Sequence, residues 1–287
     1  MRGRMTAACV AAALVLAACG GDDGGGGDEE ASTDTEAPAE QTTTTTTAPA
    51  GPLRILVSND DGSEGVQEGL DALVEGLLTL DDVEVTVSIP LEDRTGSSDN
   101  SEPGEQATSE VTTASGYPAT AVAGFPADAV EQGIATMEEP PHLVVTGINY
   151  GQNFGPLSEL SGTVGAARTG ARNGIPALAV SQGAFPNGGP EPDYPAAVDL
   201  TLEWINEHRD ELVTAEPVDG IATVMSLNVP TCPSGEQGEL LELPTATEAQ
   251  VAGQDLGAVD CETPVADPAH DVEGFLAGHP VLSELTA

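Results

Sequence analysis

Lysine is absent from this chain of 287 residues, and its seven basic residues, all arginines, stand against 48 aspartates and glutamates. The missing lysine excludes lysine-dependent P-loops, pyridoxal Schiff bases and lysine general bases. A formal net charge of −41 argues against binding of polymeric nucleic acid, which depends on cationic side chains that neutralise phosphates. Aromatic residues make up only 3% of the chain, so a packed core must be aliphatic. The composition therefore indicates a soluble, acidic protein that would need a metal ion to attract a phosphate.

Residues 1–18 have the pattern of a bacterial export signal. Arg2 and Arg4 precede an apolar stretch that is too short for a resident membrane helix. The stretch ends in the sequence LAAC at 16–19, which resembles the lipobox of bacterial lipoproteins. That resemblance implies cleavage before Cys19, lipidation of this cysteine and an extracytoplasmic location at the cell membrane, held by the lipid anchor only. The alternative is an ordinary secretory signal with a coincidental cysteine.

Residues 19–52 are expected to be a linker that joins the anchor to a folded domain at 53–287. The segment is rich in glycine, threonine and acidic residues, and six threonines follow one another at 42–47. It offers almost no apolar surface to bury, so we expect a disordered, flexible spacer. Beyond it, Cys232 and Cys261 are the two cysteines of the domain, and an oxidising compartment favours a disulfide between them. A zinc site is the weaker interpretation, because no further ligand stands at a suitable spacing.

The pattern of residues 53–287 alternates strands and helices. Strands are predicted over residues 53–58, 83–89, 143–146, 176–181 and 222–228, and helices over 66–80, 126–137, 163–173 and 194–212. This βαβ order predicts an α/β fold of Rossmann-like type, with a mostly parallel sheet and helices on both faces. Ligands bind to such sheets beyond the carboxyl ends of the strands.

Two adjacent carboxylates, Asp60 and Asp61, follow the first predicted strand, and Gly62 supplies a turn there. Neighbouring side chains on a strand point to opposite faces, so they can share a ligand only where the chain turns. Two converging carboxylates repel each other unless a cation lies between them, and hard oxygen ligands select Mg²⁺, Mn²⁺ or Ca²⁺. The alternative is a solvated turn in which Asp61 caps a helix.

Other strand ends carry polar groups that favour the cation. The segment 147–155 is rich in glycine and amide side chains and follows the buried strand 143–146. Residues 161–163 then open a helix, whose free N–H groups suit a phosphate. The segment 94–98 follows the second strand and adds hydroxyl groups. Because these ends meet at one edge of the sheet, we expect them to form one site.

Five short segments in this order resemble one family. They are ILVSNDDG at 55–62, DRTG at 93–96, GFPAD at 124–128, GIN at 147–149 and SGTV at 161–164. Together they resemble the SurE survival-protein family, whose members are metal-dependent 5′/3′-nucleotidases with a three-layer sandwich fold. The resemblance runs from about residue 53 to 230 and resumes at 274–286, where family members have a glycine-aromatic strand and a closing leucine-threonine.

Carried over residue by residue, the resemblance implies a Mg²⁺ or Mn²⁺ site made by Asp60, Asp61, Asn149 and Thr95. Family members usually have serine at the position of Thr95, so Ser97 or Ser98 is an alternative source of the hydroxyl oxygen. Further residues are expected to bind the phosphate and the rest of the substrate: Asn59, Asn153, Ser161, Gly162 and Thr163.

The resemblance implies an enzyme that hydrolyses nucleoside 5′- and 3′-monophosphates to nucleoside and phosphate outside the cytoplasm. Asp60 and Asp61 are the expected catalytic residues. One of them takes the proton of an attacking water or attacks the phosphorus directly, and the sequence does not distinguish these routes.

Some positions depart from the family pattern. Tyr150 stands where family members commonly have arginine, and Leu282 where they often have histidine. The segment between 230 and 274 is shorter than in the family, acidic and without aromatics. It argues against the exchange of an arm between subunits that family members use, and it leaves a homodimer open. These departures keep an alternative open, a non-catalytic lipoprotein of SurE type that binds a nucleotide or a protein partner.

Overall fold

The structure is a computed structural model, and it describes residues 51–287 except 64, 66, 186–188 and 264. The predicted signal peptide, the lipidation site Cys19 and all but the last two residues of the predicted linker lie outside the described residues. Among the residues that are described, no helix is both long enough and apolar enough to cross a membrane.

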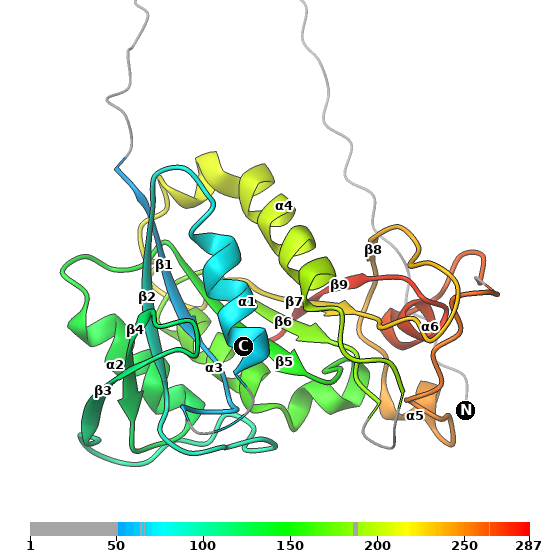
Figure 1. Cartoon of the computed structure of the whole chain (residues 1–287), viewed down its shortest axis with the longest axis horizontal. Coiled ribbons are helices and arrows are strands. Elements are labelled where there is room, and N and C mark those ends of the chain that lie inside the picture. The colour runs from blue at the N-terminus through cyan, green and yellow to red at the C-terminus, as the bar shows by residue number, and fades with distance from the viewer. Residues whose placement is uncertain (1–50, 64, 66, 186–188, 264) are drawn as a thin grey trace, which may run out of the picture. The chain divides into compact units, whose positions relative to one another are not determined.

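One nine-stranded sheet forms the centre of the domain (Figure 1). Its strands are β1 (Leu53–Ser58), β2 (Val83–Pro90), β3 (Thr108–Thr112), β4 (Pro118–Val122), β5 (Leu143–Tyr150), β6 (Ala177–Gln182), β7 (Val224–Val229), β8 (Leu241–Glu242) and β9 (Val281–Leu285). Their order across the sheet is β3-β4-β2-β1-β5-β6-β7-β9-β8. The six strands from β4 to β7 in this order are parallel, while β3 and β9 run antiparallel to their neighbours β4 and β7. The predicted α/β class with a mostly parallel sheet is confirmed.

Helices cover both faces of this sheet because its central strands are apolar on both sides. The helices are α1 (Glu68–Leu77), α2 (Pro126–Thr136), α3 (Gly162–Arg172), α4 (Tyr194–Leu212), α5 (Glu248–Val251) and α6 (Asp271–Leu276), with a 3₁₀ helix η1 (Gly155–Glu159). Ile55 and Val57 of β1 pack with α1 and α4 in one cluster. Leu56 points to the other face and packs with α2 and α3. The alternation of side chains along β1 thus builds the two halves of the core.

The C-terminal segment differs from the expectation. Gly274 and Phe275 belong to helix α6, so the glycine-aromatic strand expected there is wrong. The helix forms because the His270 ring nitrogen Nδ1 accepts a hydrogen bond from the Glu273 N–H at 3.2 Å, which caps its first turn. Phe275 then packs on Phe154 with 4.7 Å between ring centroids. The last strand of the sheet is β9, which begins at Val281.

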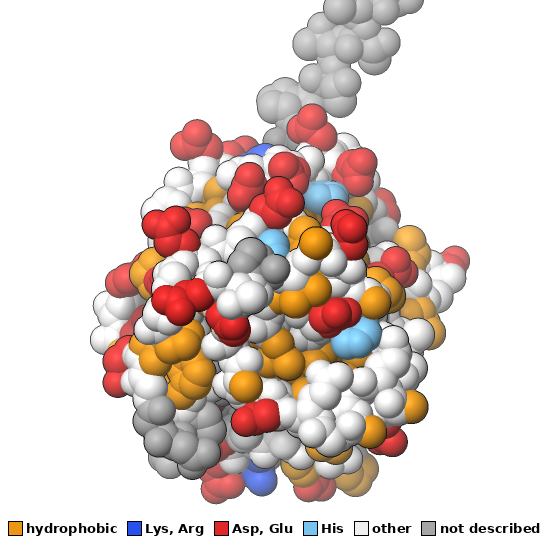
Figure 2. All heavy atoms as spheres, turned by 90° about the vertical axis from the view of Figure 1, so that its right-hand side faces the viewer, with side chains coloured by type: hydrophobic (Ala, Val, Ile, Leu, Met, Phe, Trp, Pro, Cys, Tyr) orange, Lys and Arg blue, Asp and Glu red, His pale blue; other side chains and the backbone are white. Residues whose placement is uncertain are grey.

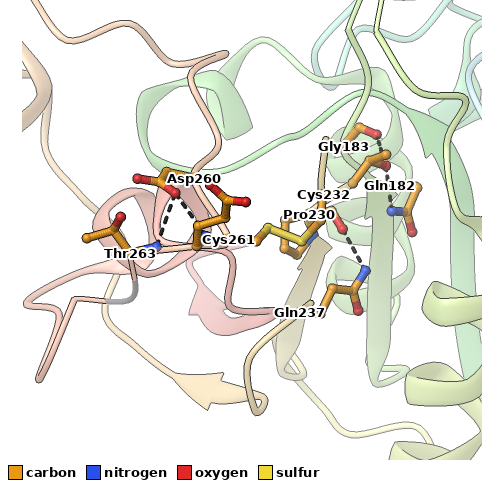
Figure 3. Close-up of a disulfide and its surroundings, with 10 residues drawn as sticks. Gln182, Gly183, Pro230, Cys232, Gln237, Asp260, Cys261 and Thr263 are labelled. Carbon is orange, nitrogen blue, oxygen red and sulfur yellow. Dashed lines mark hydrogen bonds between the residues drawn. A yellow bond between two sulfur atoms is a disulfide. The ribbon is translucent and has the colours of Figure 1, made fainter. Parts of the chain in front are cut away.

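Cys232 and Cys261 are joined by a disulfide with an S–S distance of 1.95 Å (Figure 3). Cys232 follows β7, and Cys261 lies between α5 and α6. The neighbouring backbone is tightly packed, since a Cβ added to Gly278 would lie 2.8 Å from the Cys261 sulfur. The bond ties the segment after β7 to the segment that precedes α6. Figure 2 shows that acidic side chains are spread over the face to which this region belongs, so an approaching anion is repelled there.

Candidate functional site

The carboxyl ends of β1, β2 and β5 bring the predicted site residues to one edge of the sheet. The chain goes from β1 to β2 on one side and later returns to β5 on the other side of β1. This reversal of strand order marks the place where open α/β sheets bind their ligands. Asp60 and Asp61 follow β1, the segment 93–98 follows β2, and Asn149 lies near the end of β5.

A bulge in β5 decides which way Asn149 faces. Thr146 pairs with Ala179 on β6, but the next pair is Asn149 with Ser181, so β5 contains one extra residue. Gly147 makes this possible with a φ of +129°, and a Cβ there would lie 2.3 Å from the Val180 carbonyl oxygen. The extra residue puts Asn149 on the same face as Thr146, whose hydroxyl donates to the Thr163 carbonyl oxygen of α3. The bulge therefore turns Asn149 toward the α3 side of the sheet.

The two carboxylates are buried without a cationic partner. Asp60 is 2% exposed and Asp61 is 8% exposed, and the ion pairs found among the described residues involve neither of them. Burial raises the pKa of Asp60 above its ordinary value, and hydrogen bonds from Thr163 offset only part of that rise. Burial and then the charge of Asp60 raise the pKa of Asp61 to about 8. A divalent cation beside the pair would stabilise both ionised forms.

The N-terminus of α3 approaches Asp60 closely. The Ser161 hydroxyl oxygen caps this helix by accepting from the Val164 N–H at 3.1 Å. A Cβ on Gly162 would lie only 2.7 Å from the Asp60 Cβ, so the helix can come this near only because residue 162 is glycine. The Thr163 hydroxyl donates to Asp60 Oδ1 at 2.6 Å. Thr163, expected to bind phosphate, thus directs its hydroxyl hydrogen to Asp60 and fixes the orientation of that carboxylate.

The three hydroxyl groups of the segment after β2 have different surroundings. Thr95 is exposed, and its N–H donates to Asp93 Oδ1 at 2.8 Å. The Ser98 hydroxyl donates to the Glu159 carbonyl oxygen at 2.7 Å. The Ser97 hydroxyl oxygen is buried and has no hydrogen-bond partner among the described residues.

The three asparagines predicted as site residues are all buried, but their side chains make different hydrogen bonds. Asn59 Oδ1 accepts from the Gly62 N–H at 3.3 Å and closes the turn, while its Nδ2 is buried without a partner in the described part of the chain. Asn149 Nδ2 donates to the Gly151 carbonyl oxygen at 2.7 Å, which leaves Oδ1 as the side chain's acceptor. Asn153 Nδ2 donates to Ser181 Oγ at 2.9 Å, so its amide is tied to the end of β6.

Two tyrosines at this edge were not predicted as site residues. The Tyr194 hydroxyl, at the start of α4, is buried without a partner among the described residues, and burial followed by the charge of Asp61 raises its pKa. Tyr150 directly follows Asn149 and is 41% exposed. The only sign of Tyr150 in the sequence is that it stands where family members commonly have arginine. For Tyr194 we find none, since it reads as an ordinary first residue of a helix.

The donor set fits a hard divalent cation. Two carboxylates, the Asn149 amide oxygen and a nearby hydroxyl are oxygen ligands of the kind that Mg²⁺ and Mn²⁺ prefer. Among the described residues no group of three or more His, Cys, Asp or Glu side chains could hold a metal ion. Neutral oxygens would therefore have to complete the coordination of an ion at Asp60 and Asp61. The unpartnered Ser97 oxygen beside the unpaired carboxylates supports the fit.

The protein thus belongs to the class of Rossmann-like α/β sandwich proteins with an acidic site at the carboxyl ends of the central strands. The family model described as Survival protein SurE matches residues 55–249. The chain therefore belongs to the SurE family.

Individual relatives agree with this assignment. A protein named 5'-nucleotidase SurE from Laribacter hongkongensis is 38% identical over 185 residues, which cover 64% of this chain and 68% of the relative. Another of the same name from Brevibacillus brevis is 32% identical over 189 residues, or 64% of this chain and 69% of the relative. The crystal structure of the SurE protein from Aquifex aeolicus matches with a TM-score of 0.60 at 23% identity, covering 81% of this chain and 92% of that one. This structure has the same fold.

Proposed function

We propose that this protein is a divalent-cation-dependent phosphatase that hydrolyses nucleoside 5′-monophosphates, and also 3′-monophosphates, to nucleoside and phosphate. The observation that carries the proposal is the buried, unpaired couple Asp60–Asp61 beside the N-terminus of α3. Burial without compensation costs folding free energy, so a purely structural origin of the couple is hard to justify. The name 5'-nucleotidase SurE of the relatives supports the same substrate class.

Asp60, Asp61, Asn149 and one hydroxyl of the segment 95–97 would hold the Mg²⁺ or Mn²⁺. When bound, such an ion polarises a phosphoryl oxygen and neutralises charge that develops in the transition state. The protein itself provides polar groups at the start of α3 for the remaining phosphate oxygens. Ser161 and Gly162 lie there, at the positive end of the helix dipole.

The two aspartates take different roles in this proposal. Asp60 is held in place by the Thr163 hydroxyl, which favours a role in fixing ligand geometry. No hydrogen bond contributes to the pKa of Asp61, which is set by burial and by neighbouring acidic groups. A cation bound by Asp61 would lower this pKa again, so the raised value describes the cation-free protein. We assign Asp61 as the residue that takes the proton of the attacking water because, unlike Asp60, its carboxylate is not held by a hydrogen bond among the described residues.

Tyr150 is positioned to contact the nucleoside part of the substrate. Tyr150 is 41% exposed, and it lies close enough to Tyr194, as Asp61 does, to add to the rise that burial causes in the pKa of the Tyr194 hydroxyl. Nucleobases stack on aromatic rings with little dependence on base identity. The proposal therefore assigns Tyr150 to the base and predicts weak discrimination between purines and pyrimidines.

An extracytoplasmic, lipid-anchored location is part of the same proposal. Its support is the lipobox-like sequence before Cys19 and the disulfide in the described domain, a bond that persists in oxidising compartments. Fractionation of cells that produce the Cys19→Ala variant tests it. We expect this variant to leave the membrane fraction, whereas unchanged membrane association would contradict lipidation.

Phosphate release from nucleoside monophosphates tests the catalytic proposal. The purified protein is assayed with Mn²⁺ or Mg²⁺ and again after chelation, and compared with Asp60→Asn. Asp199→Asn, which makes the same chemical change on the exposed side of α4, is the matched control. We expect activity that requires the cation and is lost only in Asp60→Asn. If the unmodified protein releases no phosphate with any divalent ion, the non-catalytic binding lipoprotein becomes the better hypothesis.

A further inference from the structure

The segment that follows β2 is held against the end of β1 by its backbone. The Arg94 N–H donates to the Asp60 carbonyl oxygen at 2.7 Å, and the Ser97 N–H donates to the Arg94 carbonyl oxygen at 3.1 Å. Gly96 has a φ of +75° and Ser98 a φ of +54°, so the chain turns sharply on either side of Ser97. These turns give the hydroxyl groups of Thr95, Ser97 and Ser98 different directions.

Ser97 points its hydroxyl at the same glycine that Asp60 approaches. The position that a Cβ would take on Gly162 is 2.9 Å from Ser97 Oγ and 2.9 Å from Asp60 Oδ2. The two oxygens are thus both close to one point at the start of α3. Asp60 Oδ1 is occupied by the Thr163 hydroxyl, which leaves Oδ2 as the oxygen that faces Ser97.

The other two hydroxyl groups are less suited to share a ligand with Asp60. Thr95 is exposed to solvent. Ser98 uses its hydroxyl hydrogen on the Glu159 carbonyl oxygen, in a contact that ties the segment to η1. Ser97 Oγ alone among the three is a buried atom without a hydrogen-bond partner in the described structure. Leaving a buried hydroxyl without a hydrogen bond costs free energy, which a bound ligand would recover.

We infer that Ser97 Oγ, rather than the Thr95 hydroxyl, is the neutral side-chain oxygen that binds the divalent cation together with Asp60. This inference rests on the proposed cation site at Asp60 and Asp61. It means that the hydroxyl ligand has moved two residues along the segment, past Gly96. The Thr95 side chain is then free to differ from serine without cost to the site.

The affinity of the purified full-length protein for Mn²⁺ tests this inference without a catalytic readout. The free ion is counted by electron paramagnetic resonance for the unmodified protein and for Ser97→Ala, Thr95→Val, Ser98→Ala and Asp60→Asn. Loss of one neutral ligand should weaken Mn²⁺ binding about tenfold in Ser97→Ala, with changes below about twofold in Thr95→Val and Ser98→Ala. Asp60→Asn should weaken it far more.

The set of variants that lose Mn²⁺ affinity distinguishes a failure of this inference from a failure of the proposed cation site. Weaker binding in Thr95→Val with unchanged binding in Ser97→Ala would overturn the assignment of Ser97 and leave the cation site standing. The same holds if both or neither of these variants lose affinity while Asp60→Asn does. Unchanged binding in Asp60→Asn would remove the cation site itself, and the inference with it.

A soft ligand placed at residue 97 gives an independent answer if Ser97→Ala disturbs the segment. Ser97→Cys should bind Cd²⁺ with a thiolate charge-transfer band in the ultraviolet, because sulfur ligands select soft ions. The band is measured as the difference from the unmodified protein, because Cys9 and Cys19 also carry thiols, and Thr95→Cys should add no such band. A band in Thr95→Cys and none in Ser97→Cys would contradict the inference.

Discussion

Two buried acidic positions in this molecule are built in opposite ways. Asp271, at the start of α6, is 2% exposed, and its carboxylate accepts hydrogen bonds from the N–H groups of Gly155, Ala246 and Val272, at 2.7, 2.7 and 2.8 Å. The couple Asp60–Asp61 is also buried, but among the described residues it has neither a cationic side chain as partner nor a comparable set of donors. The first carboxylate is satisfied within the fold, whereas the second pair is the proposed cation site.

The two positions differ in whether their buried carboxylates have enough hydrogen-bond donors. A buried carboxylate with several N–H donors joins three segments of the chain and needs nothing further. A buried couple that repels itself reduces the stability of the ion-free protein, and such pairs are more frequent at functional sites. The following predictions test this difference.

Removing the Asp271 carboxylate should have the largest effect on stability. Asp271→Ala leaves three buried N–H groups without an acceptor and uncouples α6 from η1 and from the segment at Ala246. We expect the free energy of unfolding to fall by about 3 kcal/mol or more. Urea denaturation measures it, with Asp199→Ala, the same change at an exposed position on α4, as the control. A loss below about 1 kcal/mol would show that Asp271 is not the structural partner described here.

Breaking the disulfide should have the next largest effect. Cys232 and Cys261 are separated by 29 residues, and their bond restricts the unfolded chain. Replacing both by serine should lower the free energy of unfolding by about 3 kcal/mol. The bond lies in the C-terminal region rather than at Asp60, so phosphate release measured well below the unfolding temperature should change little. A large loss of activity in the folded double variant would contradict this expectation and show that the disulfide region affects the site at Asp60.

Neutralising one member of the acidic couple should stabilise the cation-free protein. The pKa of Asp61 is about 8 in the folded protein and near 3.8 without burial, so between these values folding requires proton uptake. Stability from this group is therefore lost as the pH rises from 4 toward 8. Asp61→Asn should remove this dependence and raise the free energy of unfolding at pH 7 by about 2 kcal/mol.

Thermal unfolding of chelated samples between pH 5 and 8 checks this prediction. Added Mn²⁺ should then stabilise the unmodified protein more than Asp61→Asn. If Asp61→Asn is less stable than the unmodified protein throughout, the couple is not a source of strain in the cation-free state.

Changing Tyr150 should have the smallest effect. Tyr150→Ala should raise the KM for nucleoside monophosphates about five- to tenfold, because stacking on a partly exposed ring lies at the lower end of the range of about 1–3 kcal/mol per base. The kcat should change little, and Tyr150→Phe should behave like the unmodified protein because the ring alone is needed. An unchanged KM in Tyr150→Ala would place the base elsewhere.

The sequence predicted the central fold well because its strands and helices carry strong hydrophobic periodicity. The bounds of β1 and α4 were predicted without error. The antiparallel pair β3 and β4 was missed because β3 has almost no buried side chain, so its residues alternate too weakly to stand out. The error at Gly274 and Phe275 came from resemblance, since the capping contact of His270 with Glu273 cannot be read from spacing alone.

The sequence predicted that the site residues lie at strand and helix ends, but not which way their side chains point. The adjacent acids and the glycine before Thr163 were visible because their placement at strand and helix ends has few structural explanations. That Asn149 faces α3 depends on a bulge whose only sequence sign is Gly147. The difference between Thr95 and Ser97 depends on turns at Gly96 and Ser98, which local sequence does not determine.

A crystal of the protein soaked in Mn²⁺ and measured at the manganese absorption edge would show whether Asp60 and Asp61 bind a cation. We expect an anomalous peak within coordination distance of both carboxylates, with Asn149 Oδ1 and Ser97 Oγ among the other ligands. Ordered solvent between the two carboxylates, with no anomalous signal, would contradict this expectation.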